Sequence, residues 1–342
     1  MTIPNENAGG KQRIATCNTD DIQPERQHCY TNFYMNCRGH RTVFRWTYPS
    51  WGVVLVAFSA ILASAQELKN SAITPLALVR MTVNNEVNDG RSAAKFMFRS
   101  QKQTPKGSQT RLYVETSQAM AGMLVAINDQ PLSAEQRQAE LNHLFWLEGD
   151  PDAMRKKRAR EKEDAERTNR IMKALPDAFV YEDAGTEKGT AQVGGEGRTL
   201  TRLKFTPNPG YAPPTHVEQV LTGMQGYVLI DAEAHRIARI DGKLFKAVSF
   251  GWGIVGHLDR GSTFCVQQAN VGDGAWEITE MKLNITGKIL IFKSLAMISD
   301  EVFSEFQQVP DDLTFAKGVE LLKTQEQKFA RGASVEGAGA LP

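Results

Sequence analysis

Residues 219–292 decide the fold, and within them the segments YVLI at 227–230 and RIARI at 236–240 give the clearest signal. Both segments are rich in β-favouring side chains. The residues DAEAH at 231–235 lie between them and have the length of a hairpin connection. The sequence therefore predicts an antiparallel β-hairpin at this point.

More strands follow this hairpin. They are expected at residues 244–253, 263–271, 276–286 and 288–294, with glycines between them. Antiparallel strands in such a run form a broad, twisted sheet, and one face of that sheet must be covered. Near Glu280 the apolar alternation slips by one residue, which predicts a bulge that bends the strand.

The rest of the chain supplies shorter strands and the helices that cover the sheet. Ser133 and Gln136 have the spacing of a capping box, and Asp150 followed by Pro151 is typical of a helix start. Helices are expected at residues 73–88, 133–149, 151–175 and 315–329, and strands at 95–103, 111–116, 120–128, 179–181 and 200–205. The predicted fold class is α+β, a strongly curved antiparallel sheet covered by helices.

The N-terminal part has the pattern of an exported protein. Three arginines precede a short apolar segment at 51–62, and small residues follow it up to Ala65. These are the three parts of a secretory signal peptide. The apolar core is about 12 to 15 residues long, whereas a bilayer span needs about 20. We expect cleavage after Ala65 and a natural start at Met35, with an uncleaved signal anchor as the alternative.

This interpretation divides the chain into three parts. Residues 1–65 are expected to be a disordered leader followed by the signal peptide. Residues 66–330 form a single domain with a helical insertion at 133–175, and residues 331–342 are a disordered tail. Cys265 is the one cysteine after the predicted cleavage point, so stability must come from packing. The expected location is the periplasm.

Charge balance and motif spacing exclude several functions. With 40 basic and 39 acidic residues the formal net charge is +1, which argues against a nucleic-acid binder. The basic run at 155–160 is followed directly by acids and is interpreted as a solvated helix face. Residues 251–256 fit G-x-G-x-x-G, but a turn follows in place of the helix that dinucleotide binding requires.

Metal binding and catalysis are not indicated either. His257 and Asp259, with Cys265 nearby, offer possible ligands, but their spacing matches no zinc pattern. No nucleophile elbow or carboxylate pair stands out. The sequence therefore predicts a protein that is not an enzyme and that holds no metal and no cofactor.

The alternating apolar residues of the central strands are the candidates for a binding face. The set comprises Val228, Ile230, Ile237, Trp252, Phe264, Trp276 and Ile278. Such a face is either filled core or the lining of a cavity for an acyl chain, and the residues alone leave both open. Arg236 and Arg239 are candidates for contact with a polar head group, with solvated strand arginines as the alternative.

Two segments resemble a known family. Residues 226–240, a strand ending in Ile-Asp and a return strand RIARI, and residues 303–311, FSEFQQVPD, are similar to elements of the outer-membrane lipoprotein-sorting (LolA/LolB-like) periplasmic carriers. The resemblance implies an unclosed half-barrel that binds a lipid or lipoprotein acyl chain without covalent chemistry and that contacts membranes transiently. The charged helix from Asp150 and the acidic Asp312 depart from the family pattern. The alternative is a cell-envelope interaction or sensor module that binds a protein partner.

Overall fold

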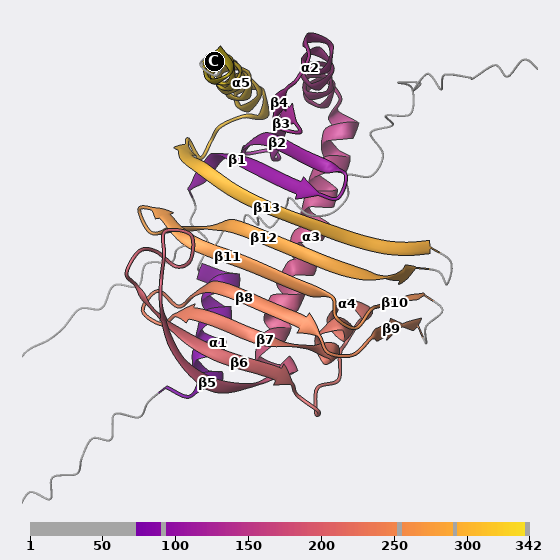
Figure 1. The fold of residues 1–342 in the computed structure, drawn as a ribbon, viewed down its shortest axis with the longest axis vertical. Helices are drawn as coiled ribbons and strands as arrows, with labels where there is room; N and C mark the ends of the chain where they lie inside the picture. Colours follow the sequence, from indigo (N-terminus) through magenta and orange to yellow (C-terminus); the bar gives the residue numbers. More distant parts are fainter. Residues whose placement is uncertain (1–72, 90–93, 252–254, 290–292, 339–342) are drawn as a thin grey trace, which may run out of the picture. The chain divides into compact units, whose positions relative to one another are not determined.

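The structure is a computed structural model that describes residues 73–89, 94–251, 255–289 and 293–338 (Figure 1). The predicted leader and signal peptide and Trp252 lie outside these residues. The helices are α1 (Pro75–Asn84), α2 (Ala134–Gly149), α3 (Pro151–Ala178), α4 (His216–Gln219) and α5 (Phe315–Ala338), with a π-helical turn η2 (Asn85–Asp89) after α1 and a 3-10 turn η3 (Val220–Gly223) after α4. In this part of the chain, no helix is long and apolar enough to cross a membrane.

The described strands form one sheet, in which all the pairings between strands are antiparallel. They are β1 (Lys95–Thr104), β2 (Gly107–Val114), β3 (Ala121–Ile127), β4 (Gln130–Pro131), β5 (Phe179–Lys188), β6 (Thr199–Pro207), β7 (Met224–Asp231), β8 (Arg236–Leu244), β9 (Val248–Phe250), β10 (Gly256–Leu258), β11 (Thr263–Gly272), β12 (Ala275–Ile289) and β13 (Lys293–Val309). Their order is β4-β3-β2-β1-β13-β12-β11-β8-β7-β6-β5, and the β9–β10 hairpin is attached to β12. The sheet is open, since β4 and β5 lie at opposite ends. The predicted α+β class with an unclosed curved sheet is confirmed.

The predicted hairpin at 227–240 is β7–β8, and side chains fix its turn. The Asp231 carboxylate accepts hydrogen bonds from the backbone N–H groups of Glu233 and Ala234, at 3.1 and 2.9 Å. His235 closes the turn in the left-handed region, with φ 49°. Arg198 forms an ion pair with Asp231, and with the backbone donors it holds the pKa of this buried carboxyl below its usual range against the opposing effect of burial.

The predicted bulge near Glu280 is confirmed. Gln267 pairs with Glu280 while Gln268 pairs with Ile278, so Thr279 is the extra residue of β12. A second register shift follows in β11 between Asn270 and Gly272. These irregularities bend the strands and change which residues share a face.

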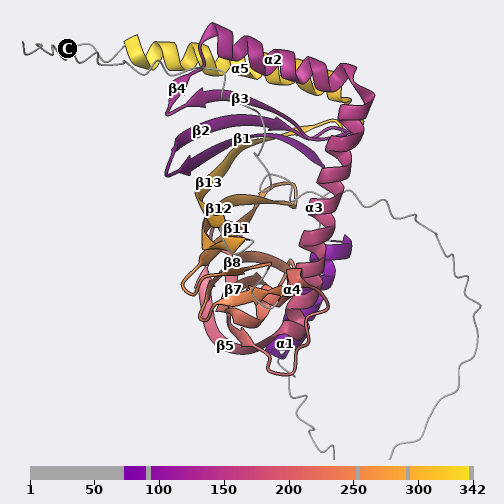
Figure 2. The same cartoon turned by 90° about the vertical axis from the view of Figure 1, so that its right-hand side faces the viewer.

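Two separate cores stabilise the two ends of the sheet. Figure 2 shows α2 and α5 next to β3 at one end and α1 near β5 at the other. At the β1–β3 end, Leu144 of α2 and Val319 of α5 pack on Leu112 and Val114. At the β5–β8 end, α1 and the last turns of α3 pack on Val228 and its neighbours. Strand register places these two cores on opposite faces of the sheet. When the pairing is followed strand by strand from Val228, the face that carries Val228 is the one opposite the side chains of the first core. The long helix α3 contributes to both.

Helix boundaries agree with the sequence at their starts and differ at their ends. The Ser133 capping box and the Asp150 N-cap with Pro151 at N1 are both present. Helix α3 extends to Ala178, past the predicted end at 175, because its last residues pack in the β5–β8 core. Helix α5 runs to Ala338, whereas the sequence analysis expected a disordered tail from Arg331. Alanines at 330, 333 and 338 favour continuation of the helix.

Candidate functional site

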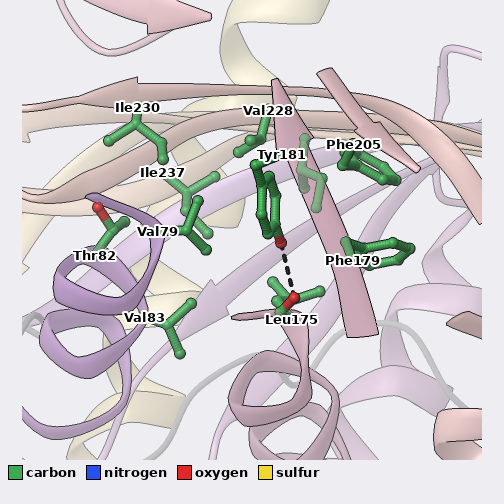
Figure 3. A pocket seen from close by; sticks show the side chains of 11 residues that line it. Val79, Thr82, Val83, Leu175, Phe179, Tyr181, Phe205, Val228, Ile230 and Ile237 are labelled. Carbon is green, nitrogen blue, oxygen red and sulfur yellow. Dashed lines mark hydrogen bonds between the residues drawn. The ribbon is translucent and has the colours of Figure 1, made fainter. Parts of the chain in front are cut away.

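The candidate site is a small apolar cavity enclosed by the β5–β8 end of the sheet, α1 and the end of α3 (Figure 3). We call it the α1 cavity. Its lining residues are Val79, Thr82, Val83, Leu175, Phe179, Tyr181, Phe205, Val228, Ile230, Ile237 and Ile240. Apart from Thr82 and Tyr181 they are hydrocarbon. The Tyr181 hydroxyl donates to the Leu175 carbonyl, at 2.9 Å, and burial raises the pKa of this phenol.

The α1 cavity is almost filled. Its volume is about 10 Å³, which is room for about one water molecule, whereas ligand pockets typically have about 300–1,000 Å³. Val79 and Val83 of α1 occupy the space over the sheet, as Figure 3 shows. A ligand larger than a water molecule can therefore reach this face only when α1 leaves it.

Helix α1 is held by polar contacts as well as by packing. Glu86, in the turn η2, accepts hydrogen bonds from Arg236 Nε at 3.0 Å and from the Ile237 backbone N–H at 2.8 Å. The Asn85 amide donates to two carbonyls of the β7–β8 turn. Near the middle of α1, Arg80 forms an exposed ion pair with Asp177 at 3.0 Å. The Thr82 hydroxyl, in contrast, is buried and has no hydrogen-bond partner among the described residues.

The seven residues that were predicted to form one binding face do not all lie together. Val228, Ile230 and Ile237 line the α1 cavity. Phe264 lies beside it, because the space over Gly242 is shared by the rings of Phe264 and Phe205. Ile278 is buried on β12 outside the cavity lining, and Trp252 lies outside the described residues.

Trp276 was expected to share this face, but it does not. It packs with Leu200, Leu229 and Ala238 in another cluster. Leu229 alternates with Val228 along β7, so this cluster lies on the opposite side of that strand. A register shift between Leu229 and Ile230 in β7–β8 lies beside this cluster.

The two predicted head-group arginines do not line the cavity. Arg236 is buried and paired with Glu86, with the Trp276 ring centroid 5.6 Å from its guanidinium carbon. Arg236 therefore stabilises the fold, and the alternative interpretation that it is a solvated arginine is wrong. Arg239 is partly exposed and lies 3.1 Å from Asp241.

Sequence reasoning missed part of the lining. Leu175, Phe179, Tyr181 and Phe205 come from the end of α3 and from β5 and β6, which were predicted as elements but not assigned to a site. Strand β5 pairs with β6, and β6 pairs with β7, and no local pattern encodes these long-range contacts. The helical spacing of Val79 and Val83 did indicate the inward face of α1.

A second hollow lies at the other end of the sheet, and we call it the α2–α3 groove. Its volume is about 600 Å³. The lining residues are Gln118, Glu148, Pro151, Met154, Arg155, Arg158, Thr314, Phe315 and Ala316. The groove is open to solvent, and Arg155 at its rim is paired with Asp152 at 2.7 Å.

The remaining candidates for chemistry are dispersed. His257 Nε2 lies 3.2 Å from Asp259 Oδ1, and in the described part of the chain no group of three His, Cys, Asp or Glu residues is placed to hold a metal ion. Gly256 begins the strand β10, so no helix follows the glycines at 251–256. The basic run at 155–160 is a solvated helix face, with Lys157 paired to Glu161 at 2.9 Å.

Glu115 has the most perturbed carboxyl group among the described acids. Burial raises its pKa from 4.5 to about 7, although the Phe96 N–H, which donates to it at 2.8 Å, and nearby Lys95 act in the opposite direction. The folded protein therefore holds a proton at Glu115 that the unfolded chain has released between pH 4.5 and 7. Stability linked to this group decreases as the pH rises through that window.

We expect Glu115→Gln to raise the free energy of unfolding by about 1–3 kcal/mol at pH 8 and to change it little at pH 4.5. The amide oxygen can still accept from the Phe96 N–H, while the partly buried charge is gone. Urea unfolding at the two pH values measures the difference. Glu182→Gln, at an exposed residue paired with Lys204, is the matched control, and an equal effect of the two substitutions would contradict the assignment.

Comparisons with known proteins do not name a family for this chain. No family model and no curated protein matches the sequence. The solved structures similar to this chain include a LolA superfamily protein from Nitrosomonas europaea, with 10% identity, a TM-score of 0.24, and 70% of this chain and 96% of that chain covered. They also include a DUF1329 family protein from Desulfovibrio piger, with 11% identity, a TM-score of 0.22, and 68% of this chain and 93% of that chain covered. At this level of similarity neither structure informs function, and the fold assignment rests on the strand order itself.

Proposed function

We propose that the protein is a non-enzymatic periplasmic carrier that binds a lipid or lipoprotein acyl chain on the face of the sheet covered by α1. The observation that supports this is the lining of the α1 cavity, which is hydrocarbon except at Thr82 and Tyr181. Such a surface binds an acyl chain through the hydrophobic effect and needs no covalent step. In the state described here α1 occupies the ligand's place.

Displacement of α1 exchanges one set of apolar contacts for another and relieves one buried polar group. The ligand would replace the packing of Leu78, Val79 and Val83 with its own methylene groups, so the apolar contact area is exchanged and not lost. Burial of the unpaired Thr82 hydroxyl costs about 1–3 kcal/mol while α1 is docked. That cost is removed when the helix leaves, which shifts the equilibrium toward the undocked helix.

Two substitutions in α1 are expected to shift lipid affinity in opposite directions. Thr82→Val keeps the shape and removes the unpaired hydroxyl, so docking is strengthened and lipid binding weakens about fivefold. Val79→Ala removes packing from the docked helix and strengthens lipid binding about tenfold. Titration with a fluorescent fatty acid, together with native mass spectrometry after mild extraction, measures both.

Met81→Ala is the matched control, because Met81 is an exposed residue of the same helix. Its lipid affinity should equal that of the wild type. If the wild type and Val79→Ala both remain without lipid in the presence of every lipid class offered, the proposal is wrong. Equal affinities for Thr82→Val and Val79→Ala would show that lipid binds elsewhere.

A protein partner is the second candidate, and the α2–α3 groove is the observation that favours it. At about 600 Å³ it is within the range of binding pockets, and its lining combines the apolar side chains of Met154 and Phe315 with the cations Arg155 and Arg158. A chain that takes up no lipid but captures one envelope protein, and loses it with Met154→Glu, would support this function over lipid carriage.

A further inference from the structure

One end of the sheet carries an unusual combination of exposed apolar side chains and unpaired cations. We call it the strand-end surface. It consists of the described residues where β8 ends, around the β9–β10 hairpin, and where β12 meets β13: Lys243, Phe245, Lys246, Val255, Arg260, Lys288, Ile289 and Lys293. Figure 1 shows these strand ends side by side.

Backbone pairing joins the β9–β10, β12 and β13 parts of this surface. Gly256 pairs with both Phe250 and Ile289, and Ile289 pairs with Lys293 on β13. A Cβ atom at Gly256 would lie 2.3 Å from the Lys288 carbonyl oxygen, and one at Gly287 would lie 2.1 Å from the His257 carbonyl oxygen. These two glycines permit the close approach of β10 and β12, which brings Val255 next to Ile289 in space.

The apolar side chains of this surface lie at the ends of strands, where they are exposed to solvent and are not part of a core. Val255 is 50% exposed, Ile289 39% and Phe245 37%. The base of the same hairpin is anchored, since Val248 is buried and Gln219 donates to the Ser249 carbonyl at 2.8 Å. The structure therefore presents these hydrophobic groups on a fixed base.

The charges around them have one dominant sign. Lys243, Lys246, Arg260, Lys288 and Lys293 are exposed, and none forms an ion pair with another described residue. The acid among them, Asp259, lies beside His257. Elsewhere on the sheet, Lys102, Lys204 and Lys282 are paired with carboxylates.

We infer that the strand-end surface docks on an anionic lipid membrane. Exposed apolar side chains enter the interface between head groups and acyl chains, and lysines and arginines beside them are attracted to anionic lipids. A surface of this size that bound a protein would be expected to have a larger apolar centre and fewer unpaired lysines, because interfaces between proteins are depleted in lysine. This docking is separate from lipid uptake and does not require α1 to move.

Vesicle binding tests the inference with the full chain. Co-sedimentation should show binding to vesicles of phosphatidylcholine with phosphatidylglycerol, weaker binding to phosphatidylcholine alone, and loss of the difference at high salt. Lys288→Glu with Lys293→Glu should weaken binding to the anionic vesicles by at least about tenfold. Val255→Asp with Ile289→Asp should weaken it by about tenfold.

Two control variants separate this surface from the rest of the chain. Val302→Asp places a charge at an exposed apolar residue of β13 away from the strand ends, and Lys156→Glu with Arg160→Glu alters the basic run on α3. Both should bind like the wild type. Circular dichroism and urea unfolding check that each variant is folded.

Hydrogen exchange reports protection for each segment of the chain, so it distinguishes docking through the strand-end surface from binding through another segment. Anionic vesicles should protect amides at residues 255–260 and 286–289. The inference is overturned if the full chain does not bind anionic vesicles, if it binds both vesicle types equally, if the strand-end variants bind like the wild type, or if protection appears at residues 155–160 and not at the strand ends.

Discussion

Glu86→Ala is expected to lower the free energy of unfolding by about 3–5 kcal/mol, the range for removing one partner of a buried ion pair. The side chains of Glu86 and Arg236 are 7% and 6% exposed, and their atoms Oε1 and Nε lie 3.0 Å apart. Removal of the carboxylate leaves the Arg236 cation buried and the Ile237 N–H without its acceptor. Urea unfolding monitored by circular dichroism measures the loss.

Three comparisons make this result specific to the ion pair. Arg80→Ala breaks the exposed pair with Asp177 and should cost about 0–1 kcal/mol. Glu86→Gln retains an acceptor for Ile237 and should fall between the two. The double variant Glu86→Ala with Arg236→Met should recover most of the lost stability, because no buried charge remains. A cost for Glu86→Ala as small as that of Arg80→Ala would contradict the account of how η2 is anchored.

Phe205→Ala is expected to destabilise the protein by about 3–5 kcal/mol as well, for a different reason. Phe205 is 1% exposed, its ring centroid lies 4.6 Å from that of Phe179, and it lines the α1 cavity. Truncation removes buried hydrocarbon and enlarges the cavity, and the surrounding β-strands cannot collapse into the space. Chemical unfolding of the variant gives the value directly.

The matched controls for Phe205 come from the same part of the sheet. Val180→Ala changes a residue of β5 that is 47% exposed and should cost about 0.5 kcal/mol or less. Phe205→Leu keeps most of the volume and should cost about 1.5 kcal/mol or less. If Phe205→Ala unfolds at the same urea concentration as Val180→Ala, the β5–β8 core does not depend on this ring.

The fold class followed from local patterns that are strong in this sequence. The alternation in YVLI and RIARI, with a short polar turn between them, identifies β7–β8. The phase slip near Glu280 identifies the bulge, and the Ser133 and Asp150 caps identify the starts of α2 and α3. Each of these signals lies within a few residues, so one sequence is sufficient to read them.

The site depended on information that is not local. Trp276 and Ile278 are two residues apart in one strand, yet the cluster that contains Trp276 lies on the other side of β7 from the α1 cavity, a placement that the alternation within β12 does not encode. Arg236 resembled a solvated strand residue, since its partner Glu86 is 150 positions away in the sequence. The near absence of free volume in the α1 cavity is likewise a property of packing that no alternation pattern predicts.

Hydrogen exchange of α1 with and without a bound fatty acid tests the central claim most directly, because the claim is that the ligand and α1 occupy the same face of the sheet. The account predicts that amides of Pro75–Asn84 lose protection when lipid binds, while those of β7 and β8 keep theirs. Unchanged protection of α1 in a chain that carries lipid would contradict it.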